Sequence, residues 1–85
     1  MTKIIIYTKN NCSYCDWAKQ LLDAKKASYE EIYVDEEPDK LTEMVERSGR
    51  RTTPQIFIND KHIGGFDDLS ALDKAGELEK LLTSI

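Results

Sequence analysis

The sequence predicts a small α/β sandwich, in which helices cover both faces of a four-stranded mixed sheet. Its 85 residues suffice for one domain, spanning residues 1–85. Runs of strand character alternate with stretches whose apolar residues recur at helical spacing. The predicted order is therefore β-α-β-α-β-β-α. We expect the first β-α-β unit to be parallel and right-handed.

The first half of the chain supplies this β-α-β unit. Residues 3–7 form an apolar run with three isoleucines, which favours a strand buried on both faces. After a polar turn, residues 16–26 have a helical pattern that ends near Ala27. Residues 29–34 alternate, which indicates a second strand. Trp17 lies off the helical stripe, and we expect it at a helix edge. The apolar and small residues of the stripe are Cys15, Ala18, Leu21 and Leu22.

A second helix is expected after three acidic residues, 35–37. Pro38 suits its first turn, acidic residues favour a helix start, and Gly49 is a natural helix end. Its predicted apolar stripe consists of Leu41, Met44 and Val45.

The remaining residues predict a hairpin and a last helical region. Residues 50–54 should form a loop, and residues 55–59 and 61–63 should form two antiparallel strands joined at Asn59-Asp60. Gly64-Gly65 should end the hairpin, and Asp67-Asp68 should open the helical region. Gly76 is expected to break this region into two pieces. Its inward-facing residues are predicted to be Leu69, Leu72, Leu78, Leu81 and Leu82.

The composition excludes several classes of partner. The net charge is −4, with basic residues scattered, so we expect no nucleic-acid partner. No run approaches the roughly 20 apolar residues of a membrane span, so we expect no membrane partner. The first residues are too short for the core of a signal peptide. We therefore expect a cytoplasmic protein, although an organelle form that has lost a presequence stays open.

The two cysteines, Cys12 and Cys15, stand in the predicted turn between the first strand and the first helix. A thiol at a helix start meets unpaired backbone N–H groups and the positive end of the helix dipole. Lys9 can add a positive charge. These influences favour the thiolate, which is the nucleophile. Cys12 is therefore the predicted attacking sulfur, and Cys15 lies one turn later, where it can resolve a mixed disulfide.

Two other interpretations of the cysteine pair are weaker. A structural zinc site needs four ligands, and His62 is the one further Cys or His in the chain. We expect His62 to be an ordinary surface residue. A static disulfide would close a very small loop, and small loops constrain the unfolded chain least. In a reducing cytosol, a Cys-x-x-Cys pair near a β-α-β unit is typical of a redox site.

Over essentially its whole length, the chain resembles the small single-domain dithiol glutaredoxins of bacteria. The resemblance implies a thioredoxin-like fold, glutathione as cosubstrate and glutathione-dependent thiol-disulfide oxidoreductase activity on disulfide-containing or glutathionylated proteins. It also implies a monomer. The matching segments are Tyr7-Thr8-Lys9, Cys12-Ser13-Tyr14-Cys15, Arg50-Arg51-Thr52-Thr53-Pro54, Gln55-Ile56-Phe57-Ile58 and Gly64-Gly65-Phe66-Asp67-Asp68-Leu69.

The resemblance also implies roles in glutathione binding. Tyr14 would form a wall of the groove, and the backbone of Thr53, before a cis Pro54, would pair with the cysteinyl part. Lys9 and Arg50 would suit the glycyl carboxylate.

The γ-glutamyl end would lie at the predicted helix start that follows Gly65. Backbone N–H groups of Phe66 and Asp67 would suit its carboxylate, and Asp67 or Asp68 its ammonium group. Alternatives stay open: Lys9 and Arg50 as solvated charges, and Asp67 and Asp68 as helix caps.

Two residues depart from the family pattern. Ser13 stands where proline is commonest, and Thr53 replaces a usual valine. Some family members with serine here hold a [2Fe–2S] cluster between two subunits with the help of glutathione. An alternative function is therefore a [2Fe–2S] carrier or sensor dimer with Cys12 as ligand. A third is an inert or sensor domain.

Overall fold

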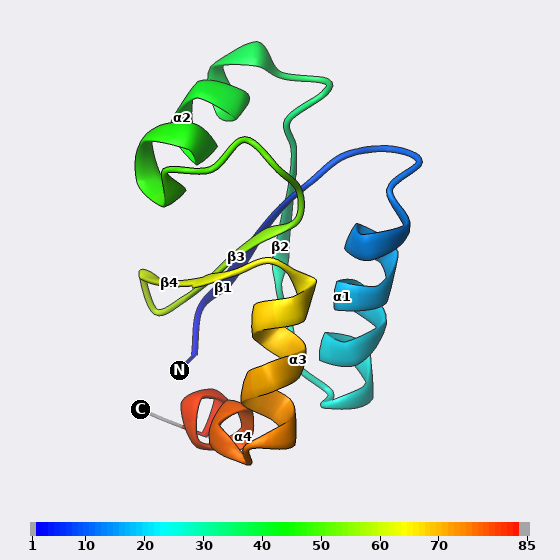
Figure 1. The fold of residues 1–85 in the computed structure, drawn as a ribbon, viewed down its shortest axis with the longest axis vertical. Coiled ribbons are helices and arrows are strands. Elements are labelled where there is room, and N and C mark those ends of the chain that lie inside the picture. The colour runs from blue at the N-terminus through cyan, green and yellow to red at the C-terminus, as the bar shows by residue number, and fades with distance from the viewer. Residues whose placement is uncertain (1, 84–85) are drawn as a thin grey trace.

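The computed structural model describes residues 2–83, which form a four-stranded sheet of order β2-β1-β3-β4 with helices on both faces (Figure 1). The predicted order is confirmed, with the last helical region in two pieces. The strands are β1 (Ile4–Thr8), β2 (Glu30–Tyr33), β3 (Gln55–Ile58) and β4 (Lys61–Gly64). The helices are α1 (Ser13–Ala24), α2 (Pro38–Ser48), α3 (Phe66–Lys74) and α4 (Glu77–Leu82).

Strand β1 organises the sheet because both its neighbours pair with it. It runs parallel to β2 and antiparallel to β3, so that Ile6 lies opposite Glu31 on one side and Ile56 on the other. All of β1 is buried, as its unbroken apolar run predicts. Strand β4 is an edge strand of the sheet and pairs antiparallel with β3.

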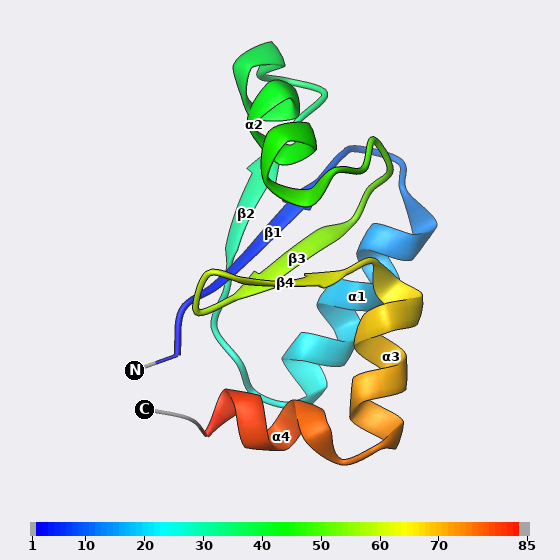
Figure 2. The same ribbon diagram turned by 60° about the vertical axis from the view of Figure 1, so that its left-hand side comes forward.

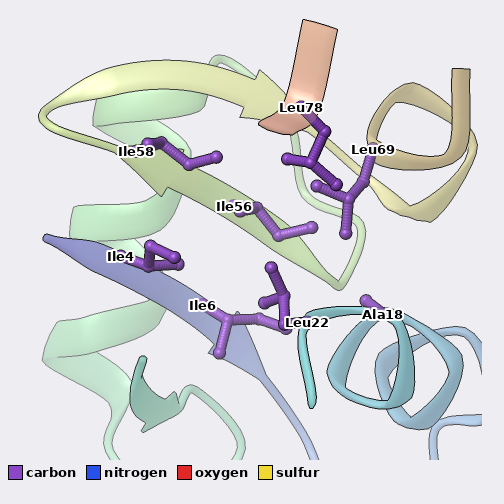
Figure 3. Close-up of a cluster of buried hydrophobic side chains, with 8 residues drawn as sticks. All are labelled: Ile4, Ile6, Ala18, Leu22, Ile56, Ile58, Leu69 and Leu78. Atoms are coloured by element: carbon purple, nitrogen blue, oxygen red, sulfur yellow. The ribbon is translucent and has the colours of Figure 1, made fainter. Parts of the chain in front are cut away.

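One core lies between the sheet and the helices α1, α3 and α4, which stand together on one side in both views (Figure 2). The isoleucines of β1 and β3 meet Leu22 of α1 and the leucines of α3 and α4 (Figure 3). The predicted stripes of α1, α3 and α4 therefore face this core. Its buried members are Ile4, Ile6, Ala18, Leu22, Ile56, Ile58, Leu69 and Leu78.

A second core lies between α2 and the opposite face of the sheet. Its buried members are Ile5, Tyr7, Ile32, Val34, Met44 and Phe57. The buried Tyr7 carries a hydroxyl that needs a partner. It donates to Glu43 and accepts a hydrogen bond of 2.9 Å from Arg47, both on α2. This pair of contacts attaches α2 to β1.

The prediction for Leu41 in the apolar stripe of α2 was wrong. Met44 is fully buried, but Leu41 is 37% exposed. Leu41 lies in the first turn of α2 and lines a surface hollow beside Cys12 instead of the core. The helical spacing is correct, but the stripe continues past the edge of the sheet.

Two glycines fix helix ends as predicted. Gly49 follows α2 with φ of 73° and donates its N–H to the carbonyl of Val45 at 2.8 Å. Gly76 separates α3 from α4 with φ of 77°. Both φ values lie in the left-handed region, which glycine adopts without a Cβ clash. Within residues 2–83, the structure has no helix long and apolar enough to cross a membrane.

We expect Leu69→Ala to lower the free energy of unfolding by about 2–5 kcal/mol, because Leu69 is fully buried and the cavity would not collapse completely. Urea unfolding monitored by circular dichroism measures this change. The control is Leu41→Ala, which should cost much less because its side chain is partly in water. Equal losses in the two variants would contradict the assignment of Leu69 to the core.

Candidate active site

Cys12 is the N-cap residue of α1, so the helix begins at Ser13. Its sulfur accepts a hydrogen bond of 3.2 Å from the backbone N–H of Cys15, one of the N–H groups that a helix start leaves unpaired. Both cysteines are free thiols, with Cys12 8% exposed and Cys15 fully buried. The predicted position in the strand-to-helix turn is confirmed for Cys12, but Cys15 lies inside α1. Periodicity placed the helix start too late because the first turn is polar.

The loop before β3 lies against the Cys12 sulfur. The Thr53–Pro54 peptide bond is cis, as the family resemblance implies. The Cys12 Sγ atom lies 3.6 Å from the hydroxyl oxygen of Thr53 and 3.9 Å from its carbonyl oxygen. Two segments that are distant in the sequence therefore meet at the reactive sulfur.

The surroundings separate the two thiols by their pKa. Burial raises the pKa of Cys12, but hydrogen bonds from Cys15 and Thr53 and the charge of Lys9 outweigh burial and lower it below its usual value. Burial, followed by the hydrogen bond with Cys12, raises the pKa of Cys15. The pKa values of the two thiols are thus shifted in opposite directions, and the thiol with the lowered pKa is the better candidate nucleophile.

Two surface hollows meet beside the cysteines. One, of about 630 Å³, is lined by Lys9, Leu41 and Arg51 together with Cys12. The other, of about 310 Å³, lies over the start of α3. Tyr14, Thr52 and Thr53 line both hollows, so they stand where the two meet. The further lining residues of the second hollow are Arg50, Pro54, Gly65, Phe66, Asp67 and Asp68.

The structure does not bring Arg50 together with Lys9. Arg50 donates to a carboxylate oxygen of Asp68 at 2.9 Å in the second hollow. Arg51 lines the first hollow with Lys9, and our sequence analysis gave it no role. Arg51 could have been considered because it stands beside Arg50 in the predicted loop. The sequence of that loop does not show which arginine faces which hollow.

The start of α3 distinguishes the two adjacent aspartates. Asp68 accepts hydrogen bonds from the N–H of Gly65 at 3.0 Å and from Arg50, and these two bonds, with Arg50 first, lower the pKa of Asp68. Asp68 is therefore the capping residue at position N3, which accepts from the N–H of the N-cap residue, Gly65. Asp67 is exposed and makes no hydrogen bond or ion pair among residues 2–83 that occupies its carboxylate. A Cβ at Gly64 would lie 2.2 Å from Asp68 Oδ2, so this cap requires glycine there.

Gln55 supports the loop and was predicted only as a strand residue. It is fully buried, and its amide donates to the carbonyl of Thr52 at 3.0 Å. Its carbonyl accepts from His62 at 2.7 Å. His62 is thus a half-buried supporting residue. A polar residue at the start of an apolar strand was the signal that could have identified Gln55.

Tyr14 is 54% exposed and Trp17 is 46% exposed. Their rings meet edge to face, with centroids 5.1 Å apart, and the Phe66 ring lies 5.9 Å from Trp17. Trp17 is thus at the helix edge, as predicted. Phe66 and Trp17 thus pack around the Tyr14 ring, which forms the wall between the two hollows.

Metal ligands do not gather at this site. Within the described part of the chain, residues 2–83, no three His, Cys, Asp or Glu side chains lie where they could hold a metal ion. The geometry brings together a low-pKa thiol, a second buried thiol, cations on one side and a helix start on the other. Such an arrangement can carry out thiol-disulfide exchange with an elongated charged ligand.

Comparison with known proteins gives consistent matches. The family model described as glutaredoxin matches residues 4–63. The chain is 52% identical to glutaredoxin 3 of Escherichia coli K12 over 82 residues, covering 96% of this chain and 99% of that protein. It is 44% identical to a glutaredoxin of Pseudomonas aeruginosa over 84 residues, covering 99% of this chain and 100% of that protein.

Solved structures agree with this result. The solution structure of glutaredoxin from Brucella melitensis is 50% identical, with a TM-score of 0.88, covering 99% of this chain and 91% of that one. The crystal structure of a buckwheat glutaredoxin–glutathione complex is 34% identical, with a TM-score of 0.89, covering 96% and 77% of the two chains. The thioredoxin-like fold is thereby confirmed.

We expect the rate of Cys12 alkylation by iodoacetamide to titrate with a midpoint below the usual thiol value of about 8.5. Lys9→Gln should move the midpoint upward, because it removes a positive charge that favours the thiolate. Mass spectrometry of the singly labelled protein measures the rate at each pH. The matched control is Lys61→Gln, an exposed lysine on β4, which should leave the midpoint unchanged. A midpoint above 8.5 would contradict the helix-terminus argument.

Proposed function

The chain belongs to the glutaredoxin family and is a glutathione-dependent thiol-disulfide oxidoreductase, and we propose that it works by a dithiol mechanism in which Cys12 attacks and Cys15 resolves. The observation that carries this proposal is the N-cap position of Cys12, whose sulfur accepts the Cys15 N–H. A thiolate there is stabilised before the substrate arrives.

The proposed reaction has two routes. With a glutathionylated protein, the Cys12 thiolate attacks the glutathione sulfur and the protein thiolate leaves; a second glutathione then removes the glutathionyl group as glutathione disulfide. With a protein disulfide, attack by Cys12 leaves the substrate tethered to Cys12. Cys15 then attacks the Cys12 sulfur, which frees the substrate and leaves a Cys12–Cys15 disulfide that glutathione reduces.

We propose that glutathione lies across both hollows. The backbone of Thr53, adjacent to the Cys12 sulfur, is available to pair with the cysteinyl part. Lys9 and Arg51 in the first hollow supply positive charge for the glycyl carboxylate. The N–H groups of Phe66 and Asp67 at the start of α3 suit the γ-glutamyl carboxylate. A buckwheat relative was solved in complex with glutathione, which supports this ligand.

The roles of the remaining predicted residues follow from their partners. Tyr14 and Pro54 wall the second hollow, and Gly65 provides the close turn before α3. Arg50 is held by Asp68, so we propose that it positions the α3 start rather than the glycyl carboxylate. Asp67, whose carboxylate is in water, is the proposed partner of the glutathione ammonium group.

The [2Fe–2S] alternative is not favoured. The family matches support the oxidoreductase without it. We propose a monomer that acts in the cytoplasm on disulfide-containing or glutathionylated proteins, since a reducing compartment keeps both thiols free to react.

The two sulfurs can be separated by mutation. We expect Cys12→Ser to abolish all thiol transfer, because a hydroxyl is not ionised at neutral pH. We expect Cys15→Ser to keep most deglutathionylation, which needs one protein thiol, and to lose most protein-disulfide reduction. Coupled assays with glutathione measure both, with insulin as the disulfide substrate and the mixed disulfide of glutathione and 2-mercaptoethanol as the small one.

Two outcomes would refute the dithiol mechanism. If Cys15→Ser retains insulin reduction, a one-thiol mechanism is enough. If the folded Cys15→Ser protein loses both activities equally, Cys15 does more than resolve the mixed disulfide.

The aspartates provide a second separation. Asp67→Asn should raise the KM for glutathione several-fold with unchanged stability, because its carboxylate is free for the ligand. Asp68→Asn should lower the free energy of unfolding by about 1 kcal/mol, the usual effect of a lost cap. Glutathione kinetics and urea unfolding of both variants measure these effects. An unchanged KM in Asp67→Asn would remove Asp67 from the binding site.

A further inference from the structure

Thr8 ends β1 with a hydroxyl that has no evident use. The residue is fully buried, and within residues 2–83 its oxygen is the one buried side-chain nitrogen or oxygen without a hydrogen-bond partner. A buried hydroxyl without a partner costs folding free energy. An unpartnered buried hydroxyl therefore requires an explanation. One explanation is that the hydroxyl gains a hydrogen-bond partner in another state of the protein.

Strand alternation shows where this hydroxyl points. Successive side chains of a strand face opposite sides, so Thr8 continues the row of Ile4 and Ile6. That row faces α1, where Ile6 lies beside Leu22 (Figure 3). Cys15 lies on the same buried face of α1, two turns before Leu22. The row that begins with isoleucines therefore ends with a hydroxyl opposite a sulfur.

The groups around the Cys15 sulfur agree with this placement. Burial and the neighbouring Cys12 sulfur raise the pKa of Cys15. The Thr8 hydroxyl, the Thr53 hydroxyl and the backbone N–H of Lys9 act in the opposite direction. The groups that lower the pKa of Cys15 are thus two hydroxyls and one backbone donor. A neutral thiol uses these donors weakly, but a thiolate would accept from them strongly.

We propose that Thr8 is a positioning residue for the resolving thiol: its hydroxyl donates to the Cys15 sulfur whenever that sulfur carries negative charge. This inference rests on the proposed resolving role of Cys15. It explains why a fully buried sulfur can become charged without a buried cation beside it. It also explains why the hydroxyl is left without a partner while Cys15 is a thiol.

The Cys15 sulfur carries negative charge at two points of the cycle. In the first, Cys15 gives its proton to solvent and attacks the Cys12 sulfur; the Cys12–Cys15 bond forms, and the substrate sulfur leaves with the electron pair and takes a proton from water. In the second, glutathione thiolate attacks the Cys12 sulfur, and Cys15 leaves as the thiolate and is then protonated. A second glutathione releases Cys12 and forms glutathione disulfide.

Deglutathionylation provides an internal control because the Cys15 sulfur carries no negative charge at any step of that route. Only Cys12 changes its bonding on that route. A residue that acts on Cys15 should therefore affect protein-disulfide reduction and leave deglutathionylation unchanged. A residue that merely supports the fold, or acts on Cys12, should affect both reactions.

The test compares Thr8→Val, which keeps the branched shape and removes the hydroxyl, with Thr8→Ser, which keeps the hydroxyl. We expect Thr8→Val to reduce insulin disulfides about tenfold more slowly, the size of effect expected when a hydrogen bond to a charged group is lost. Its activity on the mixed disulfide of glutathione and 2-mercaptoethanol should stay within about twofold. Its urea midpoint should stay equal or rise, because valine removes a buried hydroxyl that has no partner. Thr8→Ser should reduce insulin like the parent protein.

Three results would overturn the role of Thr8: unchanged insulin reduction in Thr8→Val, equal loss of both activities, or a loss in Thr8→Ser as large as in Thr8→Val. The last would assign the effect to the methyl group. Cys15→Ser measured in parallel separates this inference from the dithiol mechanism. If Cys15→Ser loses insulin reduction and Thr8→Val keeps it, only the role of Thr8 fails. If both keep it, the dithiol mechanism fails.

Discussion

The hydrogen bond from the Cys15 N–H to the Cys12 sulfur is the contact on which the rest of the site depends. It exists because Cys12 caps α1, and a helix start leaves N–H groups without partners. The cap keeps its place because Cys15, Ala18 and Leu22 press α1 onto the sheet. The apolar core thus holds the backbone donor that stabilises a thiolate at the surface.

Burial gives the two sulfurs different chemistry, although three positions separate them in the chain. Cys12 is slightly exposed and has donors and a nearby lysine, whereas Cys15 is fully buried. Cys12 is the N-cap residue, with an extended backbone outside the helix, whereas Cys15 lies in the first turn of α1 on its buried face. The proposed order, in which Cys12 attacks and Cys15 resolves, rests on this asymmetry.

The groove is assembled from four segments that meet at one end of the molecule: the β1–α1 turn, the start of α2, the loop before β3 and the start of α3. Hydrogen bonds within the protein fix three of these segments in place. Gln55 fixes the loop at Thr52, Asp68 caps α3, and the contacts of Tyr7 with Glu43 and Arg47 hold α2. Two of the residues that support the groove, Gln55 and Tyr7, are fully buried polar side chains.

The sequence by itself determined the element order, the position of Cys12 near a helix start, the glycine helix ends and the family, because these depend on local spacing and on motifs that are contiguous in the chain. Only the tertiary structure decided that Arg51, rather than Arg50, lies beside Lys9, that Asp68 rather than Asp67 is the cap, and that Leu41 leaves the core. It also decided that the Thr8 hydroxyl is buried without a hydrogen-bond partner among residues 2–83. In loops and at helix ends, adjacent residues of one chemical type differ in the direction of their side chains. That direction is set by packing against segments distant in the sequence, which local spacing does not encode.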